Sequence, residues 1–237
     1  MRALLLAAGL GTRLRPLTLT VPKCLVEIDG KPLLDHWLEA LFAAGIERVL
    51  INTHWLAEVV QDHVARSPYR NRIDMVHEVE LLGTGGTILA NREWLSGGPF
   101  MVAHADNLTT FEVPGLLAAH LNRPVGCAIT MLAFHTDAPK TCGILELDAR
   151  NVVVAFHEKV ENPPGNLANA AVYIFETELV DFITKRGTAF VDLSTEVLPF
   201  YLGRIFAVIT NGYHRDIGSA EALARAREEF ARLGAHR

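Results

Sequence analysis

The chain has 237 residues, of which 50% are hydrophobic and 21% are charged, and its formal net charge is -5. This balance is typical of a globular protein, and the length suits one α/β domain with a large core. A mildly acidic chain is not expected to bind nucleic acid. An anionic ligand would have to be attracted by a local cluster of cations, because the overall field repels it.

The cysteines and the apolar segments indicate a cytoplasmic protein. Cys24, Cys127 and Cys142 are odd in number and lack the paired spacing of metal ligands. Unpaired thiols are typical of a reducing compartment. The N-terminus lacks the layout of a signal peptide, and no apolar segment approaches the length that spans a bilayer, so we expect no membrane partner.

The first informative stretch is an apolar run that ends in a glycine-rich loop. Residues 4–8 are small and aliphatic without alternation, as expected of a strand buried on both faces of a parallel sheet. Gly9 and Gly11 then allow the backbone to turn sharply and to bring its N–H groups close to an anion. Three cations lie in or near the loop, namely Arg13, Arg15 and Lys23. The stretch therefore predicts a polyphosphate site.

Two familiar phosphate-binding patterns do not fit this loop. A P-loop requires Gly, four residues and then Gly-Lys-Ser/Thr, and no such run follows the strand. The dinucleotide fingerprint requires a third glycine where this chain has Leu14. The loop sequence is Gly-x-Gly-Thr-Arg-Leu-x-Pro-Leu-Thr, and Pro22 and Lys23 follow it. This stretch is too long to be interpreted as an ordinary tight turn.

After the loop, the first half of the chain alternates helical and β-rich segments. This alternation predicts a parallel sheet with right-handed crossovers. We expect helices at 31–44, 56–66 and 87–94, and strands at 46–53, 73–77 and 99–103.

Two polar segments in this half indicate ligand binding. The run Leu82-Gly83-Thr84-Gly85-Gly86 leads into a helix, and we expect free backbone N–H groups there, at the carboxyl edge of the sheet. Asp106 follows the apolar strand 99–103, where a carboxylate can coordinate Mg²⁺ beside substrate phosphates.

Strand-like runs dominate from residue 125 onward and predict a mixed or antiparallel extension of the sheet. The expected strands are 126–134, 143–148, 152–158 and 167–175, and a helix is expected at about 220–233. Glu158 and Lys159 place opposite charges side by side, and Asn169 begins a later strand segment. Near the end, residues 213–219 contain Asp216 and a helix-capping residue, Ser219.

Several segments of the chain together resemble the signature of the sugar-1-phosphate nucleotidyltransferases. They are Gly9–Thr18 with Pro22-Lys23, Leu-Gly-Thr-Gly-Gly, Asp106, Glu158-Lys159, Asn169-Ala170-Ala171-Val172-Tyr173 and Asp216. The resemblance covers residues 4–219 and is greatest to the mannose- and heptose-1-phosphate guanylyltransferases. It implies a single-domain Rossmann-like α/β fold, with a mixed, mainly parallel sheet flanked by helices. The activity implied is transfer of a nucleotidyl group to a sugar 1-phosphate, with release of pyrophosphate.

The resemblance also implies a role for individual residues. Arg13 and Lys23 would be catalytic, and Asp106 and Asp216 would hold Mg²⁺. The nucleotide would be bound by Leu6, Ala8, Gly9, Gly11, Thr12, Glu80, Gly83 and Thr84. The sugar phosphate would be bound by Gly143, Glu158, Lys159 and Asn169.

Four residues, at three places in the chain, depart from the family pattern. His104 and Ala105 stand before Asp106 where the family usually has Asn-Gly, Ala171 replaces a glycine, and His214 stands where a tryptophan is common. His104 is more readily explained as a hydrogen-bonded histidine than as a ligand, because Mg²⁺ seldom binds imidazole.

The substrates and assembly are expectations of the same kind. GTP is favoured with a mannose- or heptose-type sugar 1-phosphate, for nucleotide-sugar synthesis that supplies polysaccharide or the cell envelope. The alternatives are a uridylyltransferase acting on glucose-, N-acetylglucosamine- or N-acetylmuramate-1-phosphate, and a catalytically silent nucleotide-sugar-binding subunit.

We expect one domain over residues 1–237, with a nucleotide-binding lobe (1–124), a sugar-phosphate-binding lobe (125–237) and no C-terminal repeat domain. A homodimer is compatible with this organisation.

Overall fold

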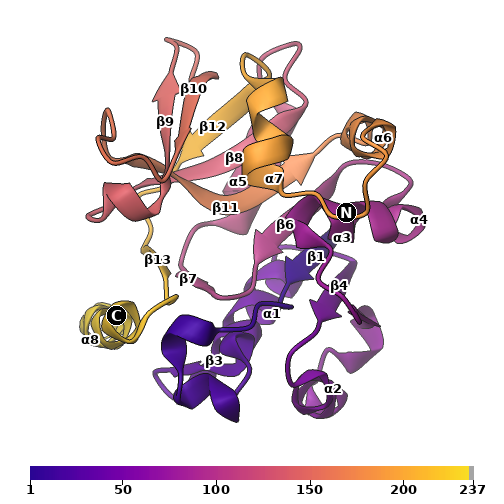
Figure 1. Ribbon diagram of the computed structural model, residues 1–237, viewed down its shortest axis with the longest axis vertical. Helices are drawn as coiled ribbons and strands as arrows, with labels where there is room; N and C mark the ends of the chain where they lie inside the picture. The colour runs from indigo at the N-terminus through magenta and orange to yellow at the C-terminus, as the bar shows by residue number, and fades with distance from the viewer. Residues whose placement is uncertain (235–237) are drawn as a thin grey trace. The chain divides into compact units, whose positions relative to one another are not determined.

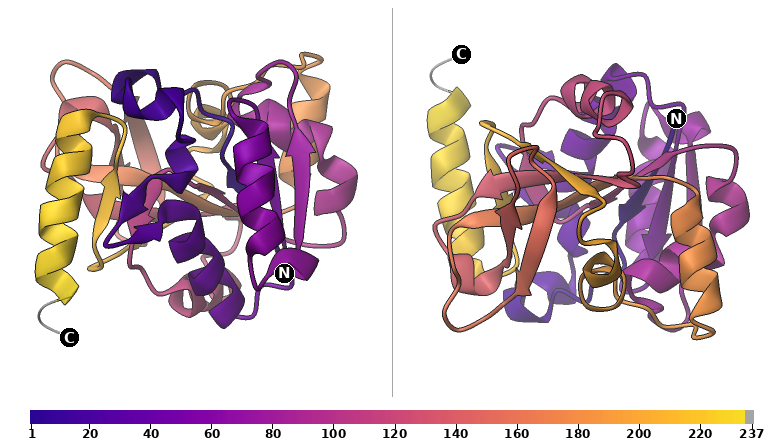
Figure 2. Two further views of the ribbon diagram at one scale, coloured as in Figure 1. Left: turned by 90° about the horizontal axis from the view of Figure 1, so that it is seen from below. Right: turned by 90° about the horizontal axis from the view of Figure 1, so that it is seen from above.

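The predicted alternation of strand and helix is present in the computed structural model, which describes residues 1–234 (Figure 1; Figure 2). The predicted mixed α/β class is thereby confirmed. Within the described part of the chain, no helix is both long and apolar enough to cross a membrane.

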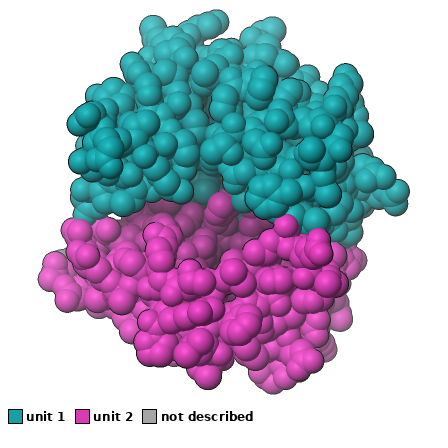
Figure 3. Space-filling model, viewed as in Figure 1, with its two compact units in different colours: residues 1–2, 82–103, 112–211 teal, residues 3–81, 104–111, 212–237 magenta. Residues whose placement is uncertain are grey.

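The chain forms two compact units, each assembled from segments that are far apart in the sequence. Unit 1 comprises residues 1–2, 82–103 and 112–211, and unit 2 comprises residues 3–81, 104–111 and the described part of 212–237 (Figure 3). Each unit therefore includes residues from both of the lobes predicted at 1–124 and 125–237. The single domain stays a prediction.

Unit 2 contains the strands β1, β4 and β5, which are neighbours in that order. Strands β4 and β5 run parallel, with Val49 opposite Ile73 and Thr53 opposite His77. The helices α1 and α2 connect consecutive strands, as the helix–strand alternation predicts. Its elements are β1 (Arg2–Leu6, with Arg2 in unit 1), β2 (Glu27–Ile28), β3 (Lys31–Pro32), α1 (Leu33–Ala43), β4 (Arg48–Thr53), α2 (Ala57–Arg66), β5 (Ile73–His77), β7 (Asn107–Thr109), β13 (His214–Asp216) and α8 (Ala220–Gly234), with the short 3-10 helices η1 (Thr12–Leu14), η2 (Leu17–Leu19), η3 (Lys23–Leu25) and η4 (Arg70–Arg72).

Unit 1 is built around β11, which pairs antiparallel with β6, β8 and β9. Strand β10 pairs antiparallel with β9, and β12 pairs parallel with β8. The predicted mixed extension of the sheet is confirmed by this pairing. The elements are α3 (Gly83–Ala90), α4 (Arg92–Leu95), β6 (Phe100–His104, with His104 in unit 2), α5 (Val113–Leu121), β8 (Ile129–His135), η5 (Pro139–Thr141), β9 (Gly143–Leu147), β10 (Val153–Glu158), β11 (Leu167–Phe175), α6 (Glu178–Lys185), α7 (Leu193–Glu196), η6 (Leu198–Tyr201) and β12 (Ile205–Ile209).

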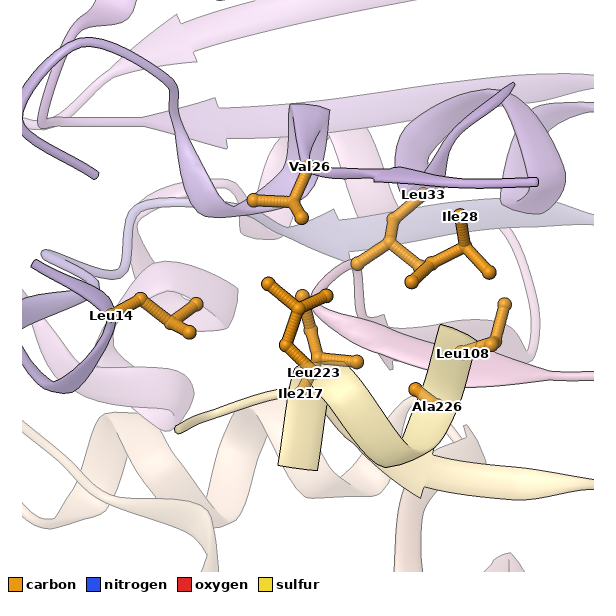
Figure 4. Close-up of a cluster of buried hydrophobic side chains, with 8 residues drawn as sticks. All are labelled: Leu14, Val26, Ile28, Leu33, Leu108, Ile217, Leu223 and Ala226. Carbon is orange, nitrogen blue, oxygen red and sulfur yellow. The ribbon is translucent and has the colours of Figure 1, made fainter. Parts of the chain in front are cut away.

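One hydrophobic cluster of unit 2 joins the glycine loop to the C-terminal helix (Figure 4). Leu14 comes from η1, Leu223 and Ala226 come from α8, and Ile217 directly follows Asp216. Burial of each large aliphatic side chain contributes about 1.5–3 kcal/mol. The packing therefore holds two residues that neighbour candidate site residues, Leu14 beside Arg13 and Ile217 beside Asp216. The eight buried members are Leu14, Val26, Ile28, Leu33, Leu108, Ile217, Leu223 and Ala226.

The helix expected at 87–94 begins earlier and is divided in two. Helix α3 starts at Gly83, and the chain bends at Asn91 before α4. Glycine is a poor helix former, so the Gly83–Gly86 turn did not indicate a helix. Close packing stabilises it instead: a Cβ at Gly83 or Gly86 would lie 2.6 or 2.3 Å from the carbonyl oxygen of Val191 or Ala189.

This packing predicts opposite effects for two Gly→Ala substitutions in helices. Gly86→Ala should destabilise the protein by about 1–3 kcal/mol, because the added methyl meets backbone that cannot move freely. Gly115→Ala in α5 is the matched control, since its nearest neighbour would be Glu112 Cβ at 3.7 Å. It should stabilise by roughly 0.5–1 kcal/mol. Chemical denaturation measures both, and equal effects would contradict the packing argument.

Candidate functional site

The glycine loop of unit 2 is fixed by a buried threonine. Gly11 has a φ of 62°, and a Cβ there would lie 2.8 Å from Thr18 Cγ2. Thr18 is fully buried, and its hydroxyl donates to the Gly11 carbonyl at 2.7 Å. The Trp55 indole N–H donates in turn to the Thr18 carbonyl at 2.8 Å. Position 11 therefore requires glycine, both for its left-handed backbone and for its contact with Thr18.

The predicted nucleotide-binding residues of this loop lie along one continuous segment. Leu6 ends β1, and the segment then runs through the loop to the start of η1. At Gly9, no heavy atom of the described residues, apart from Gly9 and its two chain neighbours, lies within 4 Å of the position that a Cβ would occupy. The remaining members on this segment are Ala8, Gly11 and Thr12.

The predicted catalytic lysine and the two predicted metal ligands come together in unit 2. Lys23 Nζ lies 2.6 Å from Asp106 Oδ2 and 3.0 Å from Asp216 Oδ1. The Lys23 side chain is only 9% exposed, whereas that of Asp216 is 54% exposed. One ammonium group therefore bridges two carboxylates that are far apart in the sequence.

A short pair of strands brings the two aspartates together. Strands β7 and β13 pair antiparallel, with Asp216 opposite Asn107, the residue after Asp106. Arg13 is mostly exposed, and its Nη2 lies 4.0 Å from Asp216 Oδ2. The group thus contains two cations and two carboxylates, with Lys23 at its buried end and Arg13 at its exposed end.

Burial and charge act in opposite directions on this group. Burial alone would lower the pKa of Lys23, but the Asp106 and Asp216 carboxylates outweigh it and raise that pKa. Burial alone would raise the pKa of Asp106, but Lys23 and then His104 outweigh it and lower that pKa. Lys23 and Asp106 are therefore both charged at neutral pH.

Each of the two unusual histidines lies two residues before one of the aspartates in the sequence. His104 ends β6, and His214 begins β13 opposite Thr109. Burial lowers the pKa of His214 to about 3, and the charge of His104 acts in the same direction, while Asp106 opposes both. His214 is consequently neutral at physiological pH.

The glycine-rich turn of unit 1 differs from the prediction in one respect. The N–H groups of Gly85 and Gly86 both donate to the Val191 carbonyl, at 2.8 and 3.1 Å, so they are not free. The Thr84 hydroxyl accepts from the Leu193 N–H at 2.7 Å. The expectation of free N–H groups was wrong at these two glycines, because a segment far along the chain supplies their acceptor.

The predicted sugar-phosphate residues gather at one end of β9, β10 and β11 in unit 1. Gly143 pairs with Glu158, and a Cβ at Gly143 would lie 2.6 Å from Glu158 Oε2. The pairing of Ala168 with Ile144 puts Asn169 opposite Gly143. Lys159 Nζ lies 3.1 Å from Glu158 Oε1, and its side chain is 64% exposed.

Two non-glycine residues of this cluster have left-handed backbones. Lys159 has a φ of 50° and Ala171 a φ of 52°. Asn169 stabilises the second, since its Oδ1 accepts from the Ala171 N–H at 2.9 Å and its Nδ2 donates to Tyr173 Oη at 2.6 Å. Such conformations are costly for residues with a Cβ and occur preferentially at functional sites.

The region around β5 contains two residues that the sequence analysis overlooked. Glu80, which was predicted to bind the nucleotide, is exposed, whereas Glu78 is 5% exposed and accepts a hydrogen bond from Asn52, which is 2% exposed. The available signal was an amide inside the apolar run Val49–Thr53, at the carboxyl end of a strand.

Comparison with protein families gives one match over almost the whole chain. The nucleotidyl transferase family model matches residues 2–232. The chain is 34% identical over 235 residues to mannose-1-phosphate guanylyltransferase of Mycobacterium tuberculosis, covering 97% of this chain and 64% of that relative. It is also 34% identical to the catalytic subunit beta of mannose-1-phosphate guanylyltransferase of Danio rerio, covering 92% of this chain and 61% of the relative. The chain thus spans less than two thirds of the length of these curated relatives.

Solved structures share the fold. HddC from Yersinia pseudotuberculosis superposes with a TM-score of 0.81 at 26% identity, covering 97% of this chain and 99% of HddC. A complex of HddC with GMP-PN gives a TM-score of 0.80 at the same identity. A putative glucose-1-phosphate thymidylyltransferase from Bacillus anthracis gives 0.85 at 18% identity, covering 96% of this chain and 94% of that one, and so supports the fold alone.

The lowered pKa of His214 predicts a pH-dependent stability. The unfolded histidine titrates near pH 6.5, so between about pH 6.5 and 3 the unfolded state binds more protons and stability falls on acidification. The slope from this group is at most about 1.4 kcal/mol per pH unit, and less for a half-buried ring. His214→Gln should flatten the dependence between pH 6.5 and 4. Urea denaturation at several pH values measures it, and parallel curves for the two proteins would contradict the assignment.

Proposed function

The chain belongs to the nucleotidyl transferase family, as its motifs predicted, and from this premise we propose that it transfers a nucleotidyl group from a nucleoside triphosphate to a sugar 1-phosphate. The products are a nucleotide-sugar and pyrophosphate. We propose GTP as the nucleotide and a mannose- or heptose-type sugar 1-phosphate as the acceptor.

The observation that carries the proposal is the ionic group of Lys23, Asp106 and Asp216 beside the glycine loop. Phosphoryl chemistry depends mainly on positioning and on neutralising charge. The attacking atom is already an anionic phosphate oxygen, so no general base is required. Lys23 lies near the reacting phosphate, and Arg13, the exposed cation of the group, stabilises the triphosphate and the departing pyrophosphate.

The two carboxylates fit a hard divalent cation such as Mg²⁺. Oxygens of both lie within 3.0 Å of one nitrogen, Lys23 Nζ, so they converge on a point that already holds a positive charge. No group of three or more His, Cys, Asp or Glu side chains in residues 1–234 could hold a metal. The further ligands would be phosphate oxygens and water, as is usual for Mg²⁺. When bound, the ion would offset the charge repulsion between the two anionic substrates.

We assign the acceptor to the cluster at the end of β9, β10 and β11. Lys159 is exposed and cationic, as a phosphate contact requires. Glu158 and Asn169 offer groups that can hydrogen-bond sugar hydroxyls, and Gly143 allows the backbone to approach the sugar. The left-handed backbone at Lys159 and Ala171 supports a functional role for this cluster.

The names of the relatives support the choice of GTP and of the sugar. The curated relatives compared above are mannose-1-phosphate guanylyltransferases. HddC was solved with GMP-PN. Neither of the curated relatives described above is named as a uridylyltransferase. A silent binding subunit is disfavoured because Arg13, Lys23, Asp106 and Asp216 are all present.

We also propose that the protein works in the cytoplasm, in nucleotide-sugar synthesis. Cys24, Cys127 and Cys142 are all unpaired, as thiols are in a reducing compartment. The homodimer stays a prediction.

The proposed activity predicts the outcome of a substrate matrix. Pyrophosphate release should be fastest with GTP and mannose 1-phosphate or a heptose 1-phosphate, when several nucleoside triphosphates are tested with several sugar 1-phosphates in Mg²⁺. Asp106→Asn removes a charge without changing size and should lower turnover at least ~100-fold. Fastest release with UTP would favour the alternative, and no release with any pair would favour the binding subunit.

The acceptor assignment predicts a selective defect for Lys159→Met. The KM for the sugar 1-phosphate should rise about tenfold or more while the KM for the nucleotide changes little. Lys140→Met is the matched control, because Lys140 is a similarly exposed lysine of unit 1, 65% exposed, whose Nζ lies 3.4 Å from Glu161. Steady-state kinetics measure the KM values of both variants. An unchanged sugar-phosphate KM for Lys159→Met would contradict the assignment of this lysine to the acceptor site.

A further inference from the structure

Asn52 connects the carboxyl ends of three strands in unit 2. Its Oδ1 accepts from the Ala7 N–H at 2.8 Å, and its Nδ2 donates to Glu78 Oε1 at 2.8 Å. Ala7 directly follows β1, Asn52 lies near the end of β4, and Glu78 directly follows β5. Since β4 is between β1 and β5 in the sheet, the side chain is placed to join its two neighbours.

The two bonds need a side chain that can both accept and donate, and the Asn52 amide does so. The Ala7 N–H can only donate and the Glu78 carboxylate can only accept, so the residue between them must accept on one side and donate on the other. The orientation of the Asn52 carboxamide follows from these partners. Asn52 is 2% exposed and Glu78 is 5% exposed, and a buried polar group that loses its partner costs about 1–3 kcal/mol.

Glu78 is itself held in place, so it can serve as an anchor. Its N–H donates to the Thr53 carbonyl at 2.8 Å, and its carbonyl oxygen lies 2.8 Å from His54 Nδ1. The backbone before Ala7 is also held, because the Ala105 N–H donates to the Leu6 carbonyl at 3.0 Å. The peptide that leads into the glycine loop is thus fixed on both sides.

We propose that Asn52 is a positioning residue for nucleotide binding: anchored by Glu78, it fixes the Ala7 peptide and thereby the entry to the glycine loop. This inference rests on the proposed function of the loop. Sheets of the α/β type bind ligands at the carboxyl ends of their strands. Hydrogen bonds that fix the spacing of these strand ends therefore affect the geometry of the binding site. A defect at Asn52 should therefore weaken nucleotide binding more than sugar-phosphate binding.

The test exchanges the donor and the acceptor of the hydrogen bond between residues 52 and 78. Asn52→Asp keeps the size and the acceptor for Ala7, but it replaces the donor to Glu78 with a second carboxylate. Glu78→Gln can present its amide oxygen to Asn52 and should bind like the wild type. In the double variant, the introduced glutamine can donate to one oxygen of the introduced aspartate, while the other oxygen of that aspartate accepts from Ala7. The bond pattern is then restored with its roles reversed.

Isothermal titration calorimetry with Mg²⁺–GTP, and separately with mannose 1-phosphate, measures the effect. The Kd for Mg²⁺–GTP should rise about 10- to 100-fold in Asn52→Asp and recover in the double variant, with the sugar-phosphate Kd little changed. Equal weakening of both ligands, or no recovery in the double variant, would overturn the proposal. If Asn52→Asp does not fold, Glu78→Ala removes the anchor alone and should weaken Mg²⁺–GTP in the same direction; unaltered binding would be contrary to the proposal.

A second readout separates this inference from the proposed function. Hydrogen exchange of residues 4–14 without ligand should be faster in Asn52→Asp and normal in the double variant. A wild-type protein that binds no nucleotide would refute the proposed function and the nucleotide role of Asn52. The exchange result would still show whether Asn52 positions the loop. Unchanged exchange in Asn52→Asp would refute the positioning itself.

Discussion

The organisation of unit 2 depends on one interaction, in which the Lys23 ammonium group bridges the carboxylates of Asp106 and Asp216. Two carboxylates brought within 3.0 Å of one point would repel each other strongly without a cation between them. Lys23 is at the start of η3, Asp106 is in the turn between β6 and β7, and Asp216 is at the end of β13. The ion group therefore ties the first and last parts of the described chain into one unit.

The surrounding structure keeps these charges in place from several directions. Thr18 fixes the glycine loop through Gly11, and the pairing of β7 with β13 brings the aspartates together. The hydrophobic cluster of unit 2 includes Leu14 and Ile217, which directly follow Arg13 and Asp216 in the sequence. Such redundancy is what a site for charge stabilisation requires, because preorganised charges need no rearrangement during the reaction.

Most of the strands could be predicted from the sequence because apolar residues predominate in them; β5 and β11 were predicted at both ends, at 73–77 and 167–175. The spacing of Lys23, Asp106 and Asp216 in the sequence does not predict that they lie close together. Only the family resemblance predicted that all three belong to the site. The acceptor of the Gly85 and Gly86 N–H groups, Val191, lies in a distant segment that local patterns do not reveal. Asn52 was overlooked because a buried amide within an apolar strand looks like an ordinary strand residue until its partners are seen.

The central claim is that this ionic group supports attack on the α-phosphorus of a nucleoside triphosphate. The most direct measurement follows the label of [α-³²P]GTP incubated with mannose 1-phosphate and Mg²⁺. The label should appear in the nucleotide-sugar and not in pyrophosphate, and Lys23→Met should leave it in GTP. Label that stays in GTP with the wild-type protein, or that is transferred equally well by Lys23→Met, would contradict the claim.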